Sequence, residues 1–167
     1  MLTKTTSRFL SILIASVLLF SFTKPVYQAN FSGTWALNTG KSELGQFGAR
    51  GVATKIVVDQ KADGVTTNKT TAGFNGGADL VTAEALTNDG KEVESTVFNG
   101  NGKRKAALKW AADGNTFTIT YSISFGQGEL TGSENWSMSA DGKQMTVTNT
   151  GNFGGNEFVT KAVYDKQ

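Results

Sequence analysis

Two kinds of turn alternate along this chain, and they limit its possible folds more than any other feature. Asp-Gly pairs begin at Asp63, Asp89, Asp113 and Asp141. Between them lie glycine-rich turns that each begin with a phenylalanine, at Phe74, Phe98, Phe125 and Phe153. Asp and Gly tolerate the positive φ of tight hairpins. Because successive turns of an up-and-down antiparallel sheet lie at opposite ends, we expect the Asp-Gly turns at one end and the phenylalanine turns at the other.

The segments between these turns have the alternation of β-strands. The clearest case is 116–125, where phenylalanine, isoleucine and tyrosine alternate with threonine and serine. This period of two distinguishes a strand from a helix. The pattern predicts an all-β domain of ten strands, at about 33–37, 52–60, 64–72, 79–87, 91–98, 103–111, 115–124, 129–138, 143–150 and 157–165.

The even number of expected strands predicts how the first and last strands of the sheet are arranged. With ten strands, the first and the last run in opposite directions, so they can pair and remove both sheet edges, which otherwise invite aggregation. We therefore expect a closed antiparallel up-and-down β-barrel of eight to ten strands. A two-sheet sandwich is the alternative.

The N-terminus has the pattern of a secretory signal peptide. Two cations, Lys4 and Arg8, precede fourteen apolar or small residues, 9–22. In a helix these would span about 21 Å, less than a hydrocarbon core of about 30 Å. We expect residues 1–29 to be the signal peptide and 30–167 the domain, exported to the periplasm or secreted, with no membrane span after cleavage.

Composition excludes many chemistries. The chain contains no cysteine and no histidine, which excludes disulfides, thiol nucleophiles, Ser-His-Asp triads and Cys- or His-ligated metals. The formal charge is +2, and residues 1–29 hold three cations and no acid, so their removal leaves −1. A nucleic-acid partner then lacks an electrostatic basis. We expect no enzyme activity, no cofactor and no metal, and a monomer.

The start of the expected domain resembles that of the lipocalins and the wider calycin group. It reads Phe31-Ser-Gly33-Thr-Trp35, a Gly-x-Trp ahead of a meander barrel. With Asp141-Gly-Lys and a late Val163-Tyr-Asp-Lys, it is similar to uncharacterised exported lipocalin-like proteins of bacteria. The resemblance implies a barrel that holds a small apolar molecule, with Trp35 at the closed base. Where lipocalins place an arginine over that tryptophan, the cation in the expected last strand is Lys161.

Alternation assigns side chains to the inside of the barrel, which either fills with them or leaves room for a ligand. The small inward residues Ala106 and Gly132 suggest space. The candidate ligand-binding residues are Trp35, Arg104, Leu108, Trp110, Phe117, Ile119, Tyr121, Glu134 and Trp136.

Two of these candidates carry charge. Arg104 and Glu134 are in phase with apolar residues, and a buried charge needs a partner. Three interpretations stay open: the two residues pair with each other, Arg104 binds a ligand carboxylate, or both lie near strand ends and reach water.

The phenylalanine turns also permit two interpretations. Phenylalanines on glycine-rich turns would make an apolar, adjustable entrance for a lipophilic ligand. Alternatively, each is the last inward residue of its strand and plugs that end. The candidate entrance rim consists of Phe74, Phe98, Phe125 and Phe153.

Two functions follow from these patterns. The first is an exported barrel that binds or carries a small lipophilic molecule in its lumen, for which an enclosed cavity is expected. The alternative is a non-catalytic structural or interaction protein of the cell envelope, for which a filled barrel and an exposed apolar patch are expected.

Overall fold

A computed structural model describes residues 28–73, 76–126 and 128–167. The expected signal peptide, up to residue 27, and the candidate rim residue Phe74 lie outside the described residues. Of the expected leader, only Gln28 and Ala29 are described, and the backbone N–H of Ala29 donates to the carbonyl of Gly114 at 2.7 Å. Within the described ranges, no helix is long and apolar enough to cross a membrane.

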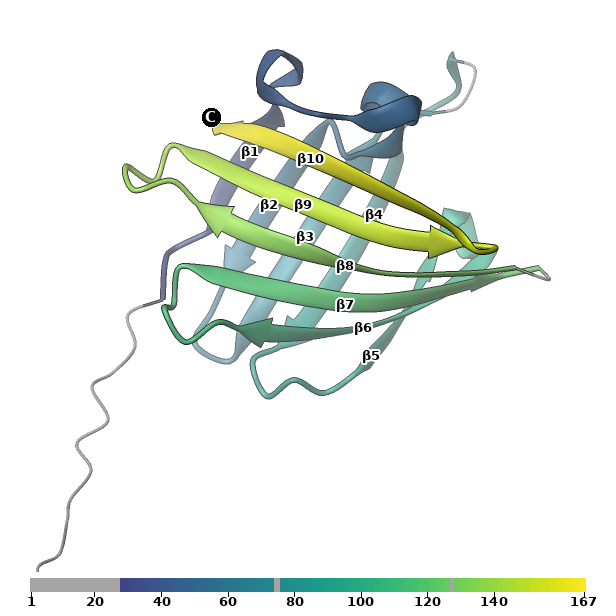
Figure 1. Ribbon diagram of the computed structural model, residues 1–167. Coiled ribbons are helices and arrows are strands. Elements are labelled where there is room, and N and C mark those ends of the chain that lie inside the picture. Colours follow the sequence, from purple (N-terminus) through teal and green to yellow (C-terminus); the bar gives the residue numbers. More distant parts are fainter. Residues whose placement is uncertain (1–27, 74–75, 127) are drawn as a thin grey trace, which may run out of the picture.

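The chain forms one antiparallel meander of ten strands (Figure 1). Short 3₁₀ segments accompany it, among them η1 (Thr39–Lys41), η2 (Gly45–Gly51) and η4 (Phe98–Gly100). The strands are β1 (Gly33–Leu37), β2 (Lys55–Gln60), β3 (Gly64–Thr71), β4 (Leu80–Thr87), β5 (Val93–Val97), β6 (Gly102–Trp110), β7 (Thr116–Phe125), β8 (Gly128–Met138), β9 (Gln144–Phe153) and β10 (Asn156–Lys166). The expected all-β class and ten strands are confirmed.

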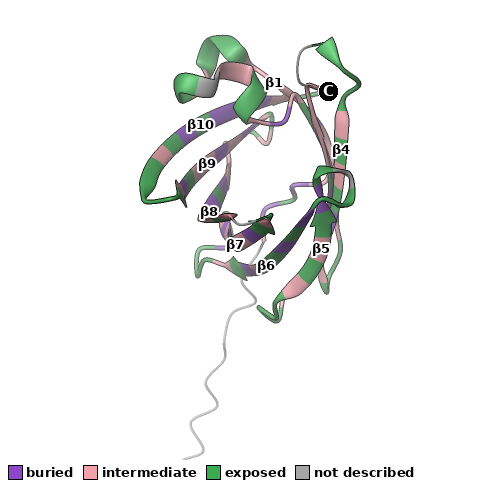
Figure 2. Cartoon of the chain, turned by 90° about the vertical axis from the view of Figure 1, so that its right-hand side faces the viewer, coloured by how far each residue is buried: buried purple, intermediate pink, exposed green. Residues whose placement is uncertain are grey.

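The first and last strands pair, as parity predicts. β1 and β10 are antiparallel, with Trp35 opposite Lys166 and Leu37 opposite Tyr164. The barrel is nearly closed rather than closed, because the sheet runs from β4 through β1 and β10 to β5 and these two end strands share no ladder. Seen from the phenylalanine-turn end, the strands form a ring in which β4 and β5 are neighbours (Figure 2). The expectation of full closure was wrong at this one seam.

Side chains connect the two strands that the backbone leaves unpaired. Arg104 of β6, next to β5, forms an ion pair with Glu84 of β4, with its Nε 2.7 Å from a carboxylate oxygen. Both side chains are buried. A charge-assisted contact of this kind is stronger than one neutral backbone hydrogen bond, so it links the barrel across the seam.

The Asp-Gly turns use glycine for two different reasons. At Gly90, Gly114 and Gly142, φ lies between +67° and +74°, as tight hairpins require. Gly64 instead faces the backbone of β4, where an added Cβ would lie 2.3 Å from the carbonyl oxygen of Leu86. Close approach of two strands, rather than positive φ, requires glycine there.

The half of the barrel toward the Asp-Gly turns is filled by aromatic side chains. The ring of Phe117 lies 4.8 Å from that of Phe31, 5.0 Å from that of Trp110 and 5.3 Å from that of Trp136, measured between centroids. Phe31, Phe117 and Trp136 have no exposed surface. These offset and edge-on pairs add to the large apolar area that each ring removes from water. This end of the barrel is a packed core.

The Gly-x-Trp sequence has a local physical explanation. Trp35 is fully buried, and its Nε1 donates to the carbonyl of Phe31 at 2.9 Å. The Nζ of Lys166 lies 5.1 Å from the centre of the Trp35 ring. A Cβ on Gly33 would lie 2.9 Å from the Cε of Lys166, so glycine makes room for this lysine. The last-strand cation over Trp35 is therefore Lys166, not Lys161, because β10 extends one residue beyond the predicted strand.

The packed core and the opposite end should respond differently to truncation. Phe117→Ala should lower the free energy of unfolding by about 3–5 kcal/mol, as for other buried aromatic residues. Phe153→Ala should lower it by less than about 1 kcal/mol, because Phe153 is 46% exposed. Urea unfolding of both variants tests this contrast, and equal losses would contradict the division of the barrel into two halves.

Candidate functional site

A cavity of about 710 Å³ occupies the half of the barrel toward the phenylalanine turns. Its volume is within the range of about 300–1,000 Å³ that is usual for small-molecule sites. η2 borders it with Gln46 and Gly51. Much of the wall is aliphatic, with Val52, Ile56, Ile123, Leu130, Val147 and Ala162. The lumen therefore has room for an apolar guest.

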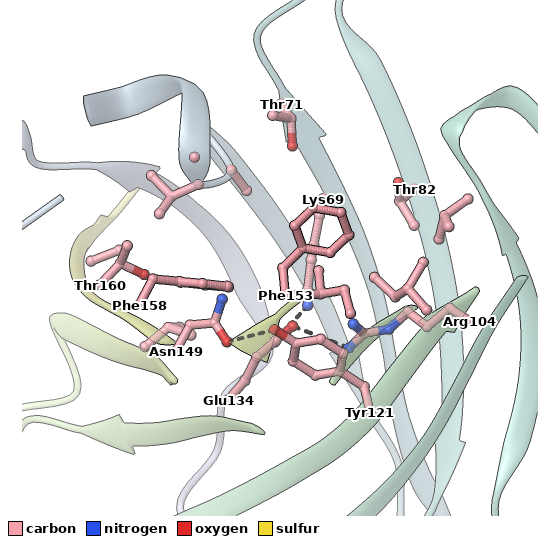
Figure 3. Close-up of a pocket in the computed structure, with 18 of the residues that line it drawn as sticks. Lys69, Thr71, Thr82, Arg104, Tyr121, Glu134, Asn149, Phe153, Phe158 and Thr160 are labelled. Atoms are coloured by element: carbon pink, nitrogen blue, oxygen red, sulfur yellow. Dashed lines mark hydrogen bonds and ion pairs between the residues drawn. The ribbon is translucent and has the colours of Figure 1, made fainter. Parts of the chain in front are cut away.

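Four charged side chains from four strands line the cavity and pair with one another, and Figure 3 labels three of them, Lys69, Arg104 and Glu134. Arg104 of β6 pairs with Glu84 of β4 at 2.7 Å and with Glu134 of β8 at 3.1 Å. The Nζ of Lys69, on β3, lies 2.6 Å from the second oxygen of Glu134. We call these four residues the ion cluster. It contains two cations and two carboxylates, so its formal charge is zero.

The structure selects among the three interpretations of Arg104 and Glu134. The two side chains pair with each other, and their exposed fractions are 7% and 11%. The interpretation that both lie near strand ends and reach water is wrong, because both side chains are buried and face the lumen, although Arg104 is only the third residue of β6. Arg104 also has a second carboxylate partner, Glu84, that the sequence reasoning missed.

The surroundings of Glu134 keep it ionised. Burial alone would raise the pKa of its carboxyl group, but the charges of Lys69 and Arg104, with hydrogen bonds from Lys69 and Trp136, lower it to about 2. The indole Nε1 of Trp136 donates to Glu134 at 3.0 Å. Burial likewise opposes the charged form of Arg104, and the two glutamates overcome it and raise its pKa. The cluster is thus held as a set of mutually compensated ions.

Tyr121 connects Arg104 of the ion cluster to Asn149, which is opposite Glu134 in the β8–β9 register. Its ring centre lies 4.2 Å from the guanidinium carbon of Arg104, within cation–π range. Its hydroxyl donates to the side-chain oxygen of Asn149, on β9, at 2.9 Å. Burial and the negative charge of Glu134 raise the pKa of Tyr121, so the hydroxyl stays protonated and acts as a donor. Asn149 lines the cavity beside it.

Two adjacent glycines decide where the rings around the cavity lie. Gly132 of β8 is opposite Tyr121 on one side and Gly151 of β9 on the other, and Gly151 is opposite Phe158. A Cβ on Gly132 would lie 2.7 Å from the Tyr121 oxygen, and one on Gly151 would lie 2.3 Å from the Phe158 ring. Each ring therefore lies over a glycine and flat against the wall.

The residues that were expected to leave space do not do so. Gly132 leaves no gap, because the Tyr121 ring lies over it. Ala106 is buried in the core and is not part of the cavity wall. The cavity is lined instead by other residues, among them Val147 and Ala162.

Three phenylalanines border the open end of the cavity. Ring centroids are 5.8 Å apart for Phe98 and Phe125, and 5.5 Å apart for Phe125 and Phe153. Phe98 is 45% exposed and has φ of +53°, an unfavourable backbone conformation for a side chain of its size. All three line the cavity and are partly exposed to solvent.

The candidate ligand-binding residues divide into two groups. Four of them lie on the cavity wall: Arg104, Tyr121, Glu134 and Trp136. The other five face inward but belong to the packed core: Trp35, Leu108, Trp110, Phe117 and Ile119. Alternation gives the inward face of a strand and not the depth at which the lumen opens, which explains the division.

Several wall residues were missed in the sequence. Glu84 is in phase with Leu86 on the expected strand 79–87, and Lys69 is in phase with Val65 on 64–72. The same in-phase criterion that identified Arg104 would have identified both. The position of Asn149 across from Tyr121 had no such signal, because it depends on the register of β7, β8 and β9.

Two lysines of β6 lie on the outer face of the barrel. Lys103 and Lys105 are exposed, and their amino groups lie 3.0 Å from Glu94 of β5 and 3.8 Å from Glu92, which precedes β5. Such exposed pairs contribute little to stability. Within the described residues no three Asp or Glu side chains gather to form a metal site.

No protein-family model matches the sequence. No curated protein matches it either.

Acid should weaken the fold through Glu134. Its pKa is about 2 in the folded protein against an ordinary value of 4.5, so its stabilising contribution is complete above about pH 4.5 and is lost as the pH falls through 2. Urea unfolding between pH 6 and pH 2 should show a smaller acid-induced loss for Glu134→Gln than for the wild type. The control Glu94→Gln, at an exposed ion pair, should keep the wild-type slope. Identical slopes in all three proteins would contradict this role.

Proposed function

We propose that this chain is an exported binding protein or carrier that holds a small lipophilic molecule in the half of its barrel toward the phenylalanine turns. The observation that carries the proposal is the cavity of about 710 Å³ with a largely aliphatic wall. Empty apolar space of this size forfeits the contacts that the wall atoms would otherwise make. A guest of matching shape restores those contacts and removes its own apolar surface from water.

The distribution of packing supports the same proposal. The aromatic core already fills the opposite half of the barrel, so the open half is not required for a minimal hydrophobic core. The alternative, a structural protein with a filled barrel, predicts similar packing at both ends. The exposed Phe98 and Phe153 at the open end are what an apolar entrance needs.

The experiment that tests the proposal is native mass spectrometry of the protein purified from its own host. We expect a fraction of the protein to carry a mass addition that organic solvent removes, and the extract should contain a lipophilic compound in stoichiometric amount. Protein that is consistently empty under gentle purification would count against a carrier.

A cavity-filling variant tests where the guest lies. Ala162 is buried on the cavity wall, so Ala162→Phe should place a ring in the cavity. We expect at least about a tenfold loss of affinity for the fluorescent probe N-phenyl-1-naphthylamine, because the ring removes a large part of the apolar contact area.

The matched control is the neighbouring outward residue, Lys161→Phe, which should bind the probe as the wild type does. Thermal unfolding of both variants checks that they fold. Equal probe binding by Ala162→Phe and the wild type would remove the cavity from the proposal.

A further inference from the structure

We infer that the cavity selects an uncharged lipophile, such as a long-chain alcohol, ketone or ester, over a fatty-acid carboxylate. The inference rests on the proposed function and adds the chemical class of the guest. It starts from the ion cluster, because within the described residues that cluster holds four of the five charged residues that line the cavity, and the fifth, Glu157, is exposed.

The cations of the ion cluster already have carboxylate partners. Arg104 uses Nε and Nη2 on Glu84 and Nη2 on Glu134, at 2.7–3.5 Å. Lys69 donates to Glu134 at 2.6 Å. A guest carboxylate would add a third negative charge to two cations. It would have to displace one of the glutamates or remain unpaired in a poorly hydrated site, and both are unfavourable.

Hydrogen-bonding capacity remains on the wall in uncharged form. Asn149 accepts from Tyr121 through its oxygen, and its amide nitrogen makes no hydrogen bond with residues 28–73, 76–126 or 128–167. Thr160 is opposite Asn149 in the β9–β10 register. Its hydroxyl is buried and has no partner in the described part of the chain. The Asn149 amide can donate to a hydroxyl, carbonyl or ester oxygen.

The positions of Asn149 and Thr160 also favour an uncharged lipophile. Both Asn149 and Thr160 line the cavity, and the apolar residues Val147 and Ala162 of the same two strands line it beside them. A molecule with one neutral polar oxygen and a long apolar body therefore matches the wall. The Asn149 amide can donate to the oxygen, and the aliphatic side chains can contact the apolar body.

The test compares two guests with the same chain and different head groups. Dodecanol and laurate displace N-phenyl-1-naphthylamine from the purified protein at pH 7.5, and their affinities are measured in parallel. We expect dodecanol to bind at least about tenfold more tightly, since the carboxylate has no cation available to it. Laurate that binds as tightly as dodecanol would overturn the inference and leave the proposed function standing. Failure of both guests and of the probe itself to bind would overturn the proposed function.

A charge variant identifies the cause of the preference. Glu84→Gln gives the ion cluster a formal charge of +1 with almost no change in shape. We expect the affinity for laurate to rise about tenfold, the size of a charge-assisted hydrogen bond, and that for dodecanol to change less than threefold. An unchanged laurate-to-dodecanol ratio would show that the cluster does not set the selectivity.

A second variant covers the case in which Glu84→Gln does not fold. Lys69→Gln leaves the cluster at −1, and Lys69 is the most exposed member of the cluster, at 18%. Its affinity for dodecylammonium should rise relative to dodecanol. No relative rise in a folded variant would contradict the inference.

Asn149→Leu tests the neutral donor. Loss of one hydrogen bond should lower the affinity for dodecanol by about three- to tenfold. Unchanged affinity would remove Asn149 from the ligand site.

Discussion

The architecture of this protein depends on one buried set of ions. Arg104, Glu84, Glu134 and Lys69 come from four different strands and compensate one another at 2.6–3.1 Å. Taking these charges out of water is costly unless every partner is in place. The cluster therefore requires that β3, β4, β6 and β8 keep their positions. It also links β6 to β4 across the seam where β4 and β5 share no backbone ladder, and it separates the aromatic core from the cavity.

The two halves of the barrel follow from the sizes of the inward side chains. On the side of the cluster toward the Asp-Gly turns, the lumen is filled by the rings of Phe31, Trp110, Phe117 and Trp136. On the other side of the cluster, Gly132 and Gly151 leave room for the rings of Tyr121 and Phe158, and the cavity lies there. The described domain has neither cysteine nor disulfide. Its stability therefore rests on a long antiparallel ladder and on a packed core in one half of the barrel, and the other half holds the cavity.

Much of this fold could be predicted because turns and alternation are local signals. The Asp-Gly and phenylalanine turns predicted ten strands and the β1–β10 pairing, and the phase of residues 103–111 placed Arg104 on the inward face without deciding whether it reaches water. The seam between β4 and β5 could not be predicted, since it depends on how the whole barrel curves. Nor could the depth of the cavity, because inward phase is the same for Ile119 in the core and Tyr121 on the wall. The partners of Arg104 required knowing that strands far apart in sequence face one lumen.

The most direct test of the account is methyl NMR during titration with a neutral lipophile such as dodecanol. The central claim is that a guest enters only the half of the barrel between the ion cluster and the phenylalanine turns. The account predicts that the methyl signals of Ile123, Leu130 and Val147 shift with saturation, and that those of Leu108 and Ile119 stay in place. Saturable shifts at Leu108 and Ile119, or none at the three cavity residues, would contradict it.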